Sequence, residues 1–348
     1  MAQALPTVHF VAGVPRGGTT FLLRRLHQHP EVMGFGESAF FGNNWVEPGP
    51  GGVLDAAQLA LVADRLLANP LNSNLRRPDD PTGRPGWIDH IDSAVAHERL
   101  RSLFGAVQVP IEPGDLFRRV CGMLADGSGA SVVVEKTPHH VRHVDRILRA
   151  VPEAKMVIVI RDPYDFLLSY KHAGERRSEE RRAVDDRLWH PLGVGLLWRS
   201  YVRAAEAARR EHPDRVMVVR LEEVSEAPAE SMARILTFLG LPTADVLAGA
   251  PVRDNSSFSG RRPELAAGDV AAFNALGRRD AVRAGYAVRR SGAGPICVLR
   301  MIAGLVPWVV RNVASAHRRT DVGLLRYARS ALFRGRQGLN PQTRRDRR

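Results

Sequence analysis

A glycine-rich turn between a short apolar run and a helix-like segment constrains the fold more than any other stretch. The segment reads VHFVAGVPRGGTTF, residues 8–21. A buried strand, a glycine turn and a helix start in this order surround an anion such as phosphate or sulfate with backbone N–H groups. Gly13 and Gly18 occupy the glycine positions of a Walker A loop, but Thr19 stands where that motif requires lysine. The pattern therefore argues against an ordinary nucleoside triphosphatase and leaves Arg16 as the cation inside the loop.

Short apolar runs recur along the chain and alternate with helix-like segments. The runs lie at 8–12, 131–135, 155–160 and 215–219, and their continuous apolar character is typical of strands buried on both faces. Helical patterns occur at 19–29, 54–68, 113–125, 138–150 and 191–211. Because strands alternate with helices, the sequence predicts one P-loop-like α/β domain with a central parallel sheet flanked by helices. Two polar stretches, 69–90 and 174–187, are predicted to be long loops.

Composition indicates a globular protein whose positive charge is concentrated at one end. The chain has 348 residues, of which 44% are hydrophobic and 25% charged, enough for a large core. The formal charge is +13, yet residues 300–348 alone contain 12 arginines and two aspartates. Two distant cysteines, Cys121 and Cys297, are expected to be buried apolar residues in a reducing compartment. The first ten residues show no signal-peptide pattern, so we expect a cytoplasmic protein.

The C-terminal segment differs in composition from the rest of the chain. Residues 295–310 form a mostly apolar run of 16 residues, interrupted by Arg300 and Pro307 and followed by arginine-studded sequence. A membrane-spanning helix needs roughly 18–20 apolar residues, so this run is too short. Two interpretations stay open: a basic helix lying on an anionic membrane surface, or a packing helix followed by a disordered basic tail. Nucleic-acid binding is disfavoured because aromatic stacking residues are sparse. We therefore predict a domain at 1–290 and a basic, helical extension at 291–348.

Two motifs carry chemistry that suits a phosphorylated nucleotide. In the first, residues 15–20, Gly17 and Gly18 allow close backbone approach, and Thr19 and Thr20 offer hydroxyl groups at a helix start. The second motif, residues 157–170, ends a predicted strand at Arg161, opens a helix with Asp162 and Pro163, and carries Ser169 two turns later. Each motif by itself also has a purely structural interpretation. The first could be only a glycine-rich turn between a strand and a helix, and the second could be only a helix cap with a salt bridge.

Together these motifs resemble the sulfotransferases that use 3′-phosphoadenosine 5′-phosphosulfate. In that family a PKxGTT or PRxGTT loop holds the 5′-phosphosulfate, and a later RDPxxxxxSxx segment holds the 3′-phosphate. The matching residues are Pro15, Arg16, Gly18, Thr19 and Thr20 for the loop, and Arg161, Asp162, Pro163 and Ser169 for the second segment. EKTPHH at 135–140, VVRLEEV at 218–224 and GYA at 285–287 are similar to further elements of the family, in the same order. The resemblance covers roughly residues 7–288 and does not reach the tail.

The resemblance also implies a catalytic base. Tyrosine-directed members follow a PRxGTT loop with His-Pro and then a glutamate, and Glu37 stands in the matching place here. Sulfuryl transfer to a hydroxyl needs a base for the acceptor proton and cations for the leaving phosphate. Glu37, Arg16 and Lys136 are expected to fill these parts without a metal ion, because fixed cations replace the magnesium of phosphoryl transfer. His140 is the alternative base, although a structural histidine capping the next helix is the plainer interpretation.

A late loop is a further candidate for nucleotide binding. Residues 252–263 carry hydroxyl groups and two adjacent arginines and resemble the family's loop over the 3′-phosphate. Ser257, Arg261 and Arg262 are the candidate ligands there. A generic surface loop of the same composition is the competing interpretation.

The sequence thus predicts a cytoplasmic sulfotransferase that moves a sulfuryl group from 3′-phosphoadenosine 5′-phosphosulfate to an acceptor hydroxyl by in-line attack. The acceptor stays open among carbohydrate, glycolipid, peptide tyrosine and natural-product phenols or alcohols, with a preference for a lipid-linked or glycolipid acceptor because of the basic, partly apolar tail. The tail also allows peripheral attachment at the inner face of an anionic membrane. Two alternatives are a P-loop small-molecule kinase and a non-catalytic, membrane-associated nucleotide-binding protein. The missing Walker lysine and the lack of a clear Walker B aspartate argue against the kinase.

Overall fold

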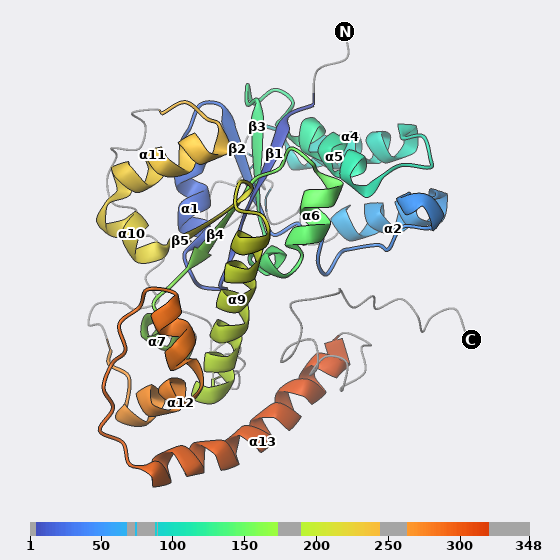
Figure 1. The fold of residues 1–348 in the computed structure, drawn as a ribbon. Helices are drawn as coiled ribbons and strands as arrows, with labels where there is room; N and C mark the ends of the chain where they lie inside the picture. The colour runs from blue at the N-terminus through green and yellow to red at the C-terminus, as the bar shows by residue number, and fades with distance from the viewer. Residues whose placement is uncertain are drawn as a thin grey trace. The chain divides into compact units, whose positions relative to one another are not determined.

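The computed structural model describes residues 5–67, 74, 88, 90–172, 189–243 and 263–319, without the side chains of residues 298 and 311–319. The chain divides into two compact units. The first consists of Met1–Val159, Ala208–Val219 and Glu223–Ala250, and the second of Ile160–Ala207, Arg220–Glu222 and Pro251–Arg348. Nearly all of the β-sheet belongs to the first unit, and the second is built mainly of helices (Figure 1).

A five-stranded sheet forms the centre of the first unit. In the spatial order β2-β3-β1-β4-β5, its strands are β1 Thr7–Gly13, β2 Val32–Gly36, β3 Val132–Lys136, β4 Met156–Ile160 and β5 Val216–Arg220. Strand β1 pairs in parallel with β3 and β4, and β3 pairs in parallel with β2. The predicted α/β fold is confirmed, and the bounds of the four predicted strands are each within about one residue of the expected positions.

The sequence pattern missed β2. Its residues, VMGFG, include two glycines, which weaken a strand signal. In the structure all five residues are buried. A Cβ atom at Gly34 would lie 2.9 Å from Cδ1 of Leu23 in helix α1 Thr19–Leu26, so the strand and helix approach each other where only glycine fits. Tertiary packing rather than local propensity makes this segment a strand.

Most of the predicted helices are confirmed. The patterns at 113–125 and 191–211 coincide with α5 Pro113–Ala125 and α9 Pro191–Glu211, and each begins with a proline, which the first helical turn tolerates. Helices α1 and α2 Ala56–Leu67 end within the expected segments.

One expected helix is divided, and other described helices were not predicted. The pattern at 138–150 corresponds to η2 Pro138–Arg142 and α6 Val144–Ala150, because His143 between them has non-helical dihedral angles (φ −127°, ψ 21°). The helices without a predicted counterpart include α10 Leu221–Glu226, α11 Pro228–Leu239 and α4 Ser93–Ala106. The buried residues of α4 are Ala96 and Leu100. So sparse an apolar period does not stand out in the sequence.

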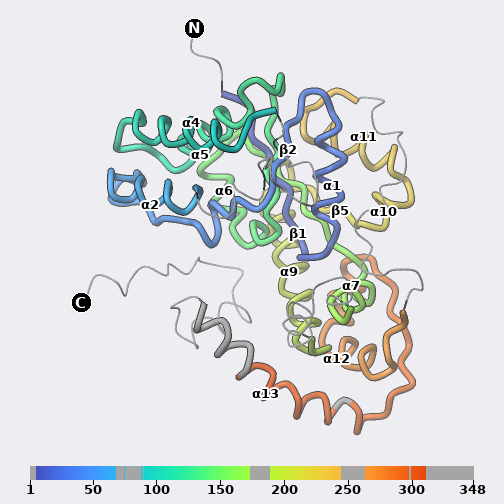
Figure 2. The backbone as a smooth tube through the Cα atoms, turned by 180° about the vertical axis from the view of Figure 1, so that it is seen from behind, coloured from blue at the N-terminus to red at the C-terminus, as the bar shows by residue number. Residues whose placement is uncertain are grey.

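Helices cover both faces of the sheet, as the two opposite views show (Figures 1 and 2). Helices α1 and α11 Pro228–Leu239 lie on one side, and α5 and α6 lie on the other. Between sheet and helices, Phe10 of β1 is completely buried. Its ring contacts those of Phe41 and Phe117 at centroid distances of 5.8 and 5.9 Å. This aromatic cluster fixes the segment that follows β2 onto the core.

The second unit contains α7 Pro163–Lys171, α12 Ala267–Arg283, α13 Pro295–Arg319 and most of α9. Trp198 of α9 is fully buried and packs edge to face on Phe273 of α12, with ring centroids 5.4 Å apart. Buried Asp280 of α12 accepts hydrogen bonds from Arg199 Nε at 2.8 Å and Arg203 Nε at 2.9 Å. Helices α9 and α12 are therefore joined by both apolar packing and charge-assisted hydrogen bonds.

The remaining predictions from the sequence concern two loops, the two cysteines and the C-terminal segment. The predicted loop at 174–187 lies outside the described residues, as does the loop at 69–90 apart from residues 74, 88 and 90. Cys121 is buried as expected, whereas Cys297, which lies on α13 beside Gly268 of α12, is only half-buried. Among the described residues, no helix is long and apolar enough to cross a membrane. The division of the chain at 290/291 stays a prediction.

Candidate active site

Three neighbouring strands of the first unit bring the candidate residues to one edge of the sheet. In the register of the sheet, Lys136 of β3 lies opposite both Val11 of β1 and Gly36 of β2. Because parallel strands end at the same edge, the glycine loop after β1, the side chain of Lys136 and the residue after Gly36, which is Glu37, meet at the carboxyl ends of the strands. Ligands of open α/β sheets bind at this edge.

The loop after β1 folds as the sequence predicts for an anion site. Gly13 has a φ of 148°, and a Cβ there would lie 2.1 Å from the Val159 carbonyl oxygen. The Val14 N–H donates to that same oxygen at 3.1 Å, and the Gly17 N–H turns back to the Val14 carbonyl at 2.8 Å. Gly18, in the left-handed conformation (φ 90°), is the N-cap of α1 and supplies no side-chain cap. The first N–H groups of α1 are thus left available to an anion.

The polar residues of this loop differ in exposure. Gly17 and Thr19 are buried, whereas Pro15, Arg16, Gly18 and Thr20 are half-buried. Arg16 has a φ of 61°, a conformation unusual for a residue with a side chain. Together these positions can surround an anion with backbone N–H groups, two hydroxyl groups and one guanidinium.

Glu37 and Lys136 form an ion pair at the same edge. Lys136 Nζ donates a hydrogen bond to Glu37 Oε1 at 2.6 Å. The side chain of Lys136 is 4% exposed, whereas that of Glu37 is 64% exposed. The lysine stem lies across Gly36, where a Cβ would come within 3.2 Å of Lys136 Cε. The ammonium is therefore held in place by packing, and the carboxylate faces solvent beside it.

The segment after β2 carries backbone strain. Among the described residues, the non-glycine residues with positive φ are Arg16 (61°), Glu37 (63°) and Ala39 (49°). Such conformations cost of order 1–3 kcal/mol each and gather at functional sites. All three belong to the glycine loop or to the segment that follows β2.

A buried carboxylate holds the strained segment. Glu135, completely buried in β3, accepts hydrogen bonds at Oε1 from the Ser38 N–H (3.0 Å), the Ser38 hydroxyl (2.8 Å) and the Thr137 hydroxyl (2.6 Å). Burial by itself raises the pKa of Glu135, but the imidazole of His140 and the hydrogen bonds from His140, Thr137 and Ser38 outweigh burial and lower the pKa. Glu135 is therefore an ionised anchor behind Glu37.

His140 does not lie where either sequence interpretation put it. Its side chain is completely buried, with Nδ1 3.0 Å from Glu135 Oε2 and its ring edge to face with Phe10 and Phe41. A ring with no exposed surface does not reach an acceptor hydroxyl, so the geometry disfavours His140 as base. Nor does it cap the next helix, because the N-cap of α6 is His143.

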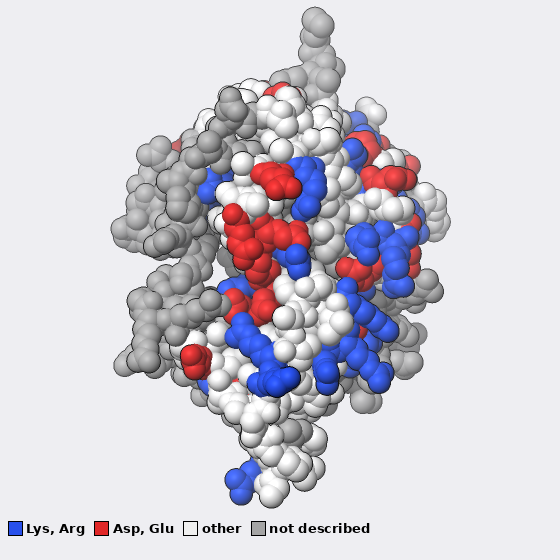
Figure 3. Space-filling view, turned by 60° about the vertical axis from the view of Figure 1, so that its left-hand side comes forward, with Lys and Arg blue, Asp and Glu red and all other residues white. Residues whose placement is uncertain are grey.

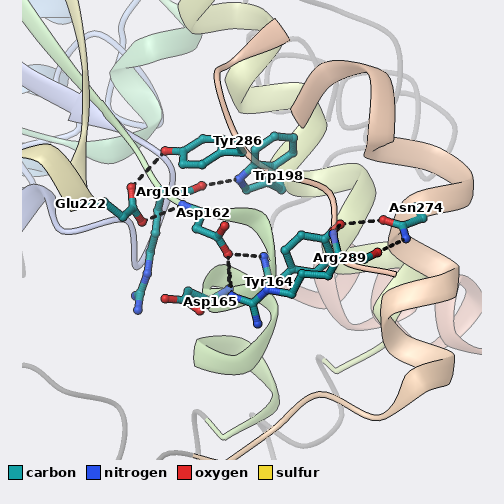
Figure 4. A network of polar contacts seen from close by, with 9 residues as sticks. All are labelled: Arg161, Asp162, Tyr164, Asp165, Trp198, Glu222, Asn274, Tyr286 and Arg289. Atoms are coloured by element: carbon teal, nitrogen blue, oxygen red, sulfur yellow. Dashed lines mark hydrogen bonds and ion pairs between the residues drawn. The ribbon is translucent and has the colours of Figure 1, made fainter. Parts of the chain in front are cut away.

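An aspartate-centred network surrounds the RDP segment in the second unit (Figure 4). Asp162 is the N-cap of α7, and its Oδ1 accepts from the Tyr164 and Asp165 N–H groups at 2.9 Å each. Its own N–H donates to Glu222 Oε1 at 2.8 Å, and Tyr286 Oη donates to the other oxygen of Glu222 at 3.2 Å. The LEEV and GYA motifs thus hold the RDP turn in place. Burial raises the pKa of Asp162 and of Glu222, and at Glu222 the charge of Asp162 adds to the rise.

The candidate 3′-phosphate ligands lie on either side of this turn. Arg161 is half-buried, its carbonyl accepts from Trp198 Nε1 at 2.8 Å, and its side chain extends away from the Glu222 carboxylate (Figure 4). Ser169 on α7 is 1% exposed. Arg289 lies beside the same turn, with Nη2 3.1 Å from Asp165 Oδ1. Ser257, Arg261 and Arg262 lie outside the described residues.

Sequence reasoning missed three residues that build the site. Ser38 and Thr137 link the segment after β2 to Glu135. Asn74 is buried, and its side-chain amide accepts from the Gly36 N–H at 2.8 Å and donates to the Gly36 carbonyl at 2.6 Å. It completes the edge of β2 as a neighbouring strand would. The sequence did not reveal the roles of these hydroxyl and amide groups, because their hydrogen-bond partners are up to about a hundred positions away in the chain.

One group of side chains has donor atoms close enough together to hold a metal ion. Among the described residues it consists of Asp145, Glu211 and His212, whose donor atoms lie within 4.8 Å of one another. The carboxylates are exposed, and His212 Nε2 already contacts Asp145 Oδ1 at 2.8 Å. The trio is separate from the edge of the sheet that carries Glu37, and nothing further at it points to an ion.

The structure is an α/β fold whose sheet edge carries a glycine loop, the carboxylate of Glu37 and the cations Arg16 and Lys136. The family model of the sulfotransferases matches residues 9–245, and the chain belongs to this family. The protein is a sulfotransferase. No curated protein matches the chain.

The comparison with solved structures found similarity to several sulfotransferases. Sulfotransferase STF9 from Mycobacterium avium is 16% identical, with 84% of this chain and 79% of that chain covered and a TM-score of 0.44. A sulfotransferase from Alicyclobacillus acidocaldarius is 21% identical, with coverages of 81% and 94% and a TM-score of 0.41. Mouse sulfotransferase SULT7A1, solved in complex with PAP, is 12% identical, with coverages of 94% and 90% and a TM-score of 0.35.

Proposed function

We propose that the enzyme transfers the sulfuryl group of 3′-phosphoadenosine 5′-phosphosulfate to an acceptor hydroxyl, with Glu37 as general base. The acceptor oxygen forms a bond to sulfur while its proton passes to the Glu37 carboxylate. The bond from sulfur to the bridging oxygen of the 5′-phosphate breaks, and 3′,5′-bisphosphoadenosine leaves with the electron pair. Arg16 and Lys136 stabilise the charge that develops on that oxygen. These residues need no metal ion for the step.

The observation that carries the proposal is the Glu37–Lys136 pair at the sheet edge. An exposed carboxylate 2.6 Å from a packed ammonium places a proton acceptor and a cation side by side. In-line transfer needs the base at the acceptor oxygen and the cation at the leaving oxygen, at opposite ends of one reacting axis, so in the proposed step the two side chains separate when donor and acceptor bind between them. The positive φ values of Arg16 and Glu37 support the same assignment, because strain of this kind is kept where a precise position matters.

The donor's phosphate groups have separate candidate ligands. We assign the 5′-phosphosulfate to the loop at 15–20 and the N-terminus of α1, where N–H groups and Arg16 favour an anion. Arg161 and Ser169 are assigned to the 3′-phosphate on the strength of the RDPxxxxxSxx motif. The loop residues Ser257, Arg261 and Arg262 are assigned to the same phosphate.

For the acceptor we propose a lipid-linked or glycolipid hydroxyl in preference to a free carbohydrate or another small molecule. The support is the basic, partly apolar segment from residue 295 onward, which suits an enzyme working beside a membrane, at its cytoplasmic face. A screen of cell extracts for donor-dependent products heavier by one sulfuryl group tests this preference. Products found only in the water-soluble fraction would contradict it.

Replacing the base separates chemistry from binding. In Glu37→Gln the side chain keeps its size and loses its proton affinity, so we expect kcat to fall about 10²- to 10⁴-fold while bisphosphoadenosine binding stays within about twofold. Single-turnover transfer to a phenol acceptor and calorimetric titration measure the two quantities. A kcat unchanged by Glu37→Gln would show that another group takes the proton. A Mg²⁺-dependent ATP phosphotransferase activity with no response to bisphosphoadenosine would instead favour the kinase.

Replacing Arg161 should weaken the binding of the 3′-phosphate and leave the binding of the 5′-phosphate unchanged. In Arg161→Ala we expect the affinity for 3′,5′-bisphosphoadenosine to fall about 10- to 100-fold, the cost of a lost charge-assisted contact. The affinity for adenosine 5′-phosphate, which lacks the 3′-phosphate, should hardly change. Arg16→Ala is the matched control and should weaken both ligands. If Arg161→Ala lowers the affinity for both ligands equally, Arg161 does not bind the 3′-phosphate.

A further inference from the structure

Helix α13 has two apolar faces, and one of them is exposed. Its large apolar side chains with high exposure are Ile296 (66%), Leu299 (63%), Ile302 (50%), Val306 (66%) and Val310 (61%). At 100° per residue these positions fall within an arc of about 120°. We call these five side chains the apolar stripe. So regular an exposed stripe differs from the scattered single apolar residues that any surface carries.

The opposite face of α13 is fixed to the second unit. A Cβ at Gly268 of α12 would lie 2.7 Å from Met301 Cε and 2.8 Å from Cys297 Sγ. A Cβ at Gly193 of α9 would lie 2.4 Å from the ring of Trp308, which also contacts the His190 ring at 5.7 Å. These three residues of α13 lie about 180° from the centre of the apolar stripe. Glycines in α9 and α12 thus seat one face of the helix, and the stripe faces outward.

The sequence of α13 and of the residues after it is strongly basic. Exposed Arg300 lies on α13 itself, and residues 300–348 hold 12 arginines against Asp321 and Asp346. The face of the molecule in Figure 3, by contrast, carries acidic and basic side chains side by side. An apolar stripe on a helix that is followed by a strongly basic segment is the pattern of a helix lying in the plane of an anionic lipid surface.

We propose that the apolar stripe of α13 binds the surface of an anionic lipid bilayer. Its side chains enter the boundary between headgroups and acyl chains, and the net positive charge of the sequence from residue 300 onward attracts the protein to anionic headgroups. The helix lies on the bilayer instead of crossing it, because Arg300 and Pro307 interrupt its apolar sequence. The seating on Gly193 and Gly268 makes this a property of the folded protein rather than of a loose tail. The inference is independent of the role of Glu37.

Vesicle flotation with the full-length protein tests the proposal. We expect the protein to float with phosphatidylcholine vesicles that contain about one third phosphatidylglycerol. Binding to pure phosphatidylcholine vesicles should be at least about tenfold weaker, and about 0.5 M salt should weaken binding to the anionic vesicles. The double variant Leu299→Glu, Val306→Glu places two charges in the stripe and should bind the anionic vesicles at least about tenfold more weakly.

A matched control separates the stripe from surface hydrophobicity in general. Val282 on α12 is 59% exposed, and Val282→Glu should float like the wild type. Bisphosphoadenosine binding by each variant reports that the protein is folded. The proposal is wrong if the wild type fails to float with anionic vesicles or if the double variant floats as well as the wild type. It is also wrong if the wild type is a concentration-dependent dimer that the double variant abolishes, or if duplex DNA removes it from vesicles.

Discussion

At the scale of single residues, the candidate site depends on positions where the chain adopts a costly conformation or leaves out a side chain. Glu37 is held at φ 63° between Gly36, whose N–H and carbonyl are both bonded to Asn74, and Ser38, which donates twice to Glu135. Hydrogen bonds of the residues on both sides hold Glu37 in its strained backbone conformation. The carboxylate is thereby directed to Lys136 by its neighbours, not by its own preference.

Gly36 gives a direct test of this packing. In Gly36→Ala the new Cβ meets Lys136 Cε at 3.2 Å and Nζ at 3.4 Å, so the lysine must move by a few tenths of an ångström. We expect kcat to fall about tenfold, because displacements of this kind disturb reacting geometry, with little change in bisphosphoadenosine affinity. Steady-state kinetics and calorimetry measure both.

Gly42→Ala is the matched control. A Cβ at Gly42 makes ordinary contacts of 3.5 Å or more, and its φ is not positive, so kcat should be unchanged. If both alanine variants have wild-type kcat, the position of Lys136 against Gly36 has no part in catalysis.

At the scale of elements, the strands that the sequence revealed are those with continuous apolar runs. β1, β3 and β4 are buried on both faces and rich in valine and isoleucine, which is the strongest strand signal available. β2 escaped because glycines fill two of its five positions. Its identity as a strand comes from its parallel pairing with β3 and from the space left for Leu23. The strand that presents Glu37 was therefore the one that local sequence could not predict.

Gly13 joins β1 to β4 at the start of the anion loop. In Gly13→Ala the methyl group would lie 2.1 Å from the Val159 carbonyl oxygen at a φ of 148°, so the hydrogen bond from Val14 to Val159 must break. We expect the free energy of unfolding to fall by about 3 kcal/mol or more, measured by urea denaturation.

Gly105→Ala serves as the control for this substitution. Gly105 lies within α4 and has open space around it. Alanine there should raise the free energy of unfolding by up to about 1 kcal/mol, because it favours the helix. Two glycine-to-alanine changes are thus expected to have opposite signs, and a Gly13→Ala variant as stable as the wild type would contradict the structure of the loop.

At the scale of the whole molecule, buried titratable groups make stability depend on pH. His9 of β1 is 3% exposed; its Nε2 lies 3.0 Å from the Leu239 carbonyl oxygen, and its Nδ1 accepts from the Lys155 N–H at 3.1 Å. This pattern fixes the neutral tautomer that carries its proton on Nε2. The pKa of His9 is lowered from 6.5 to about 4, chiefly by burial; the hydrogen bond to Leu239 opposes this shift and the charge of Lys155 adds to it.

The sign of the pH effect follows from that pKa. The unfolded chain protonates His9 near pH 6.5, before the folded protein does so near pH 4. The contribution of His9 is therefore complete above pH 6.5 and is lost as the pH falls to about 4, by about 3 kcal/mol. In His9→Gln the fall in unfolding free energy over this interval should be smaller, as urea titrations at several pH values would measure. An equally steep fall in the variant would assign the effect to other groups.

The sequence by itself determined the family, the parallel α/β sheet, the glycine loop with Arg16 and the RDP turn, and it led to the proposal of Glu37 and Lys136 as catalytic residues. These follow from contiguous motifs and apolar runs, whose physical meaning is local. Only the tertiary structure decided that β2 is a strand, that Glu135 and Asn74 anchor the segment behind Glu37, and that His140 is enclosed. Only the tertiary structure showed which face of α13 is seated and which is exposed. The reason is physical: these features depend on contacts between residues far apart in the chain, and such contacts cannot be predicted from a local sequence pattern.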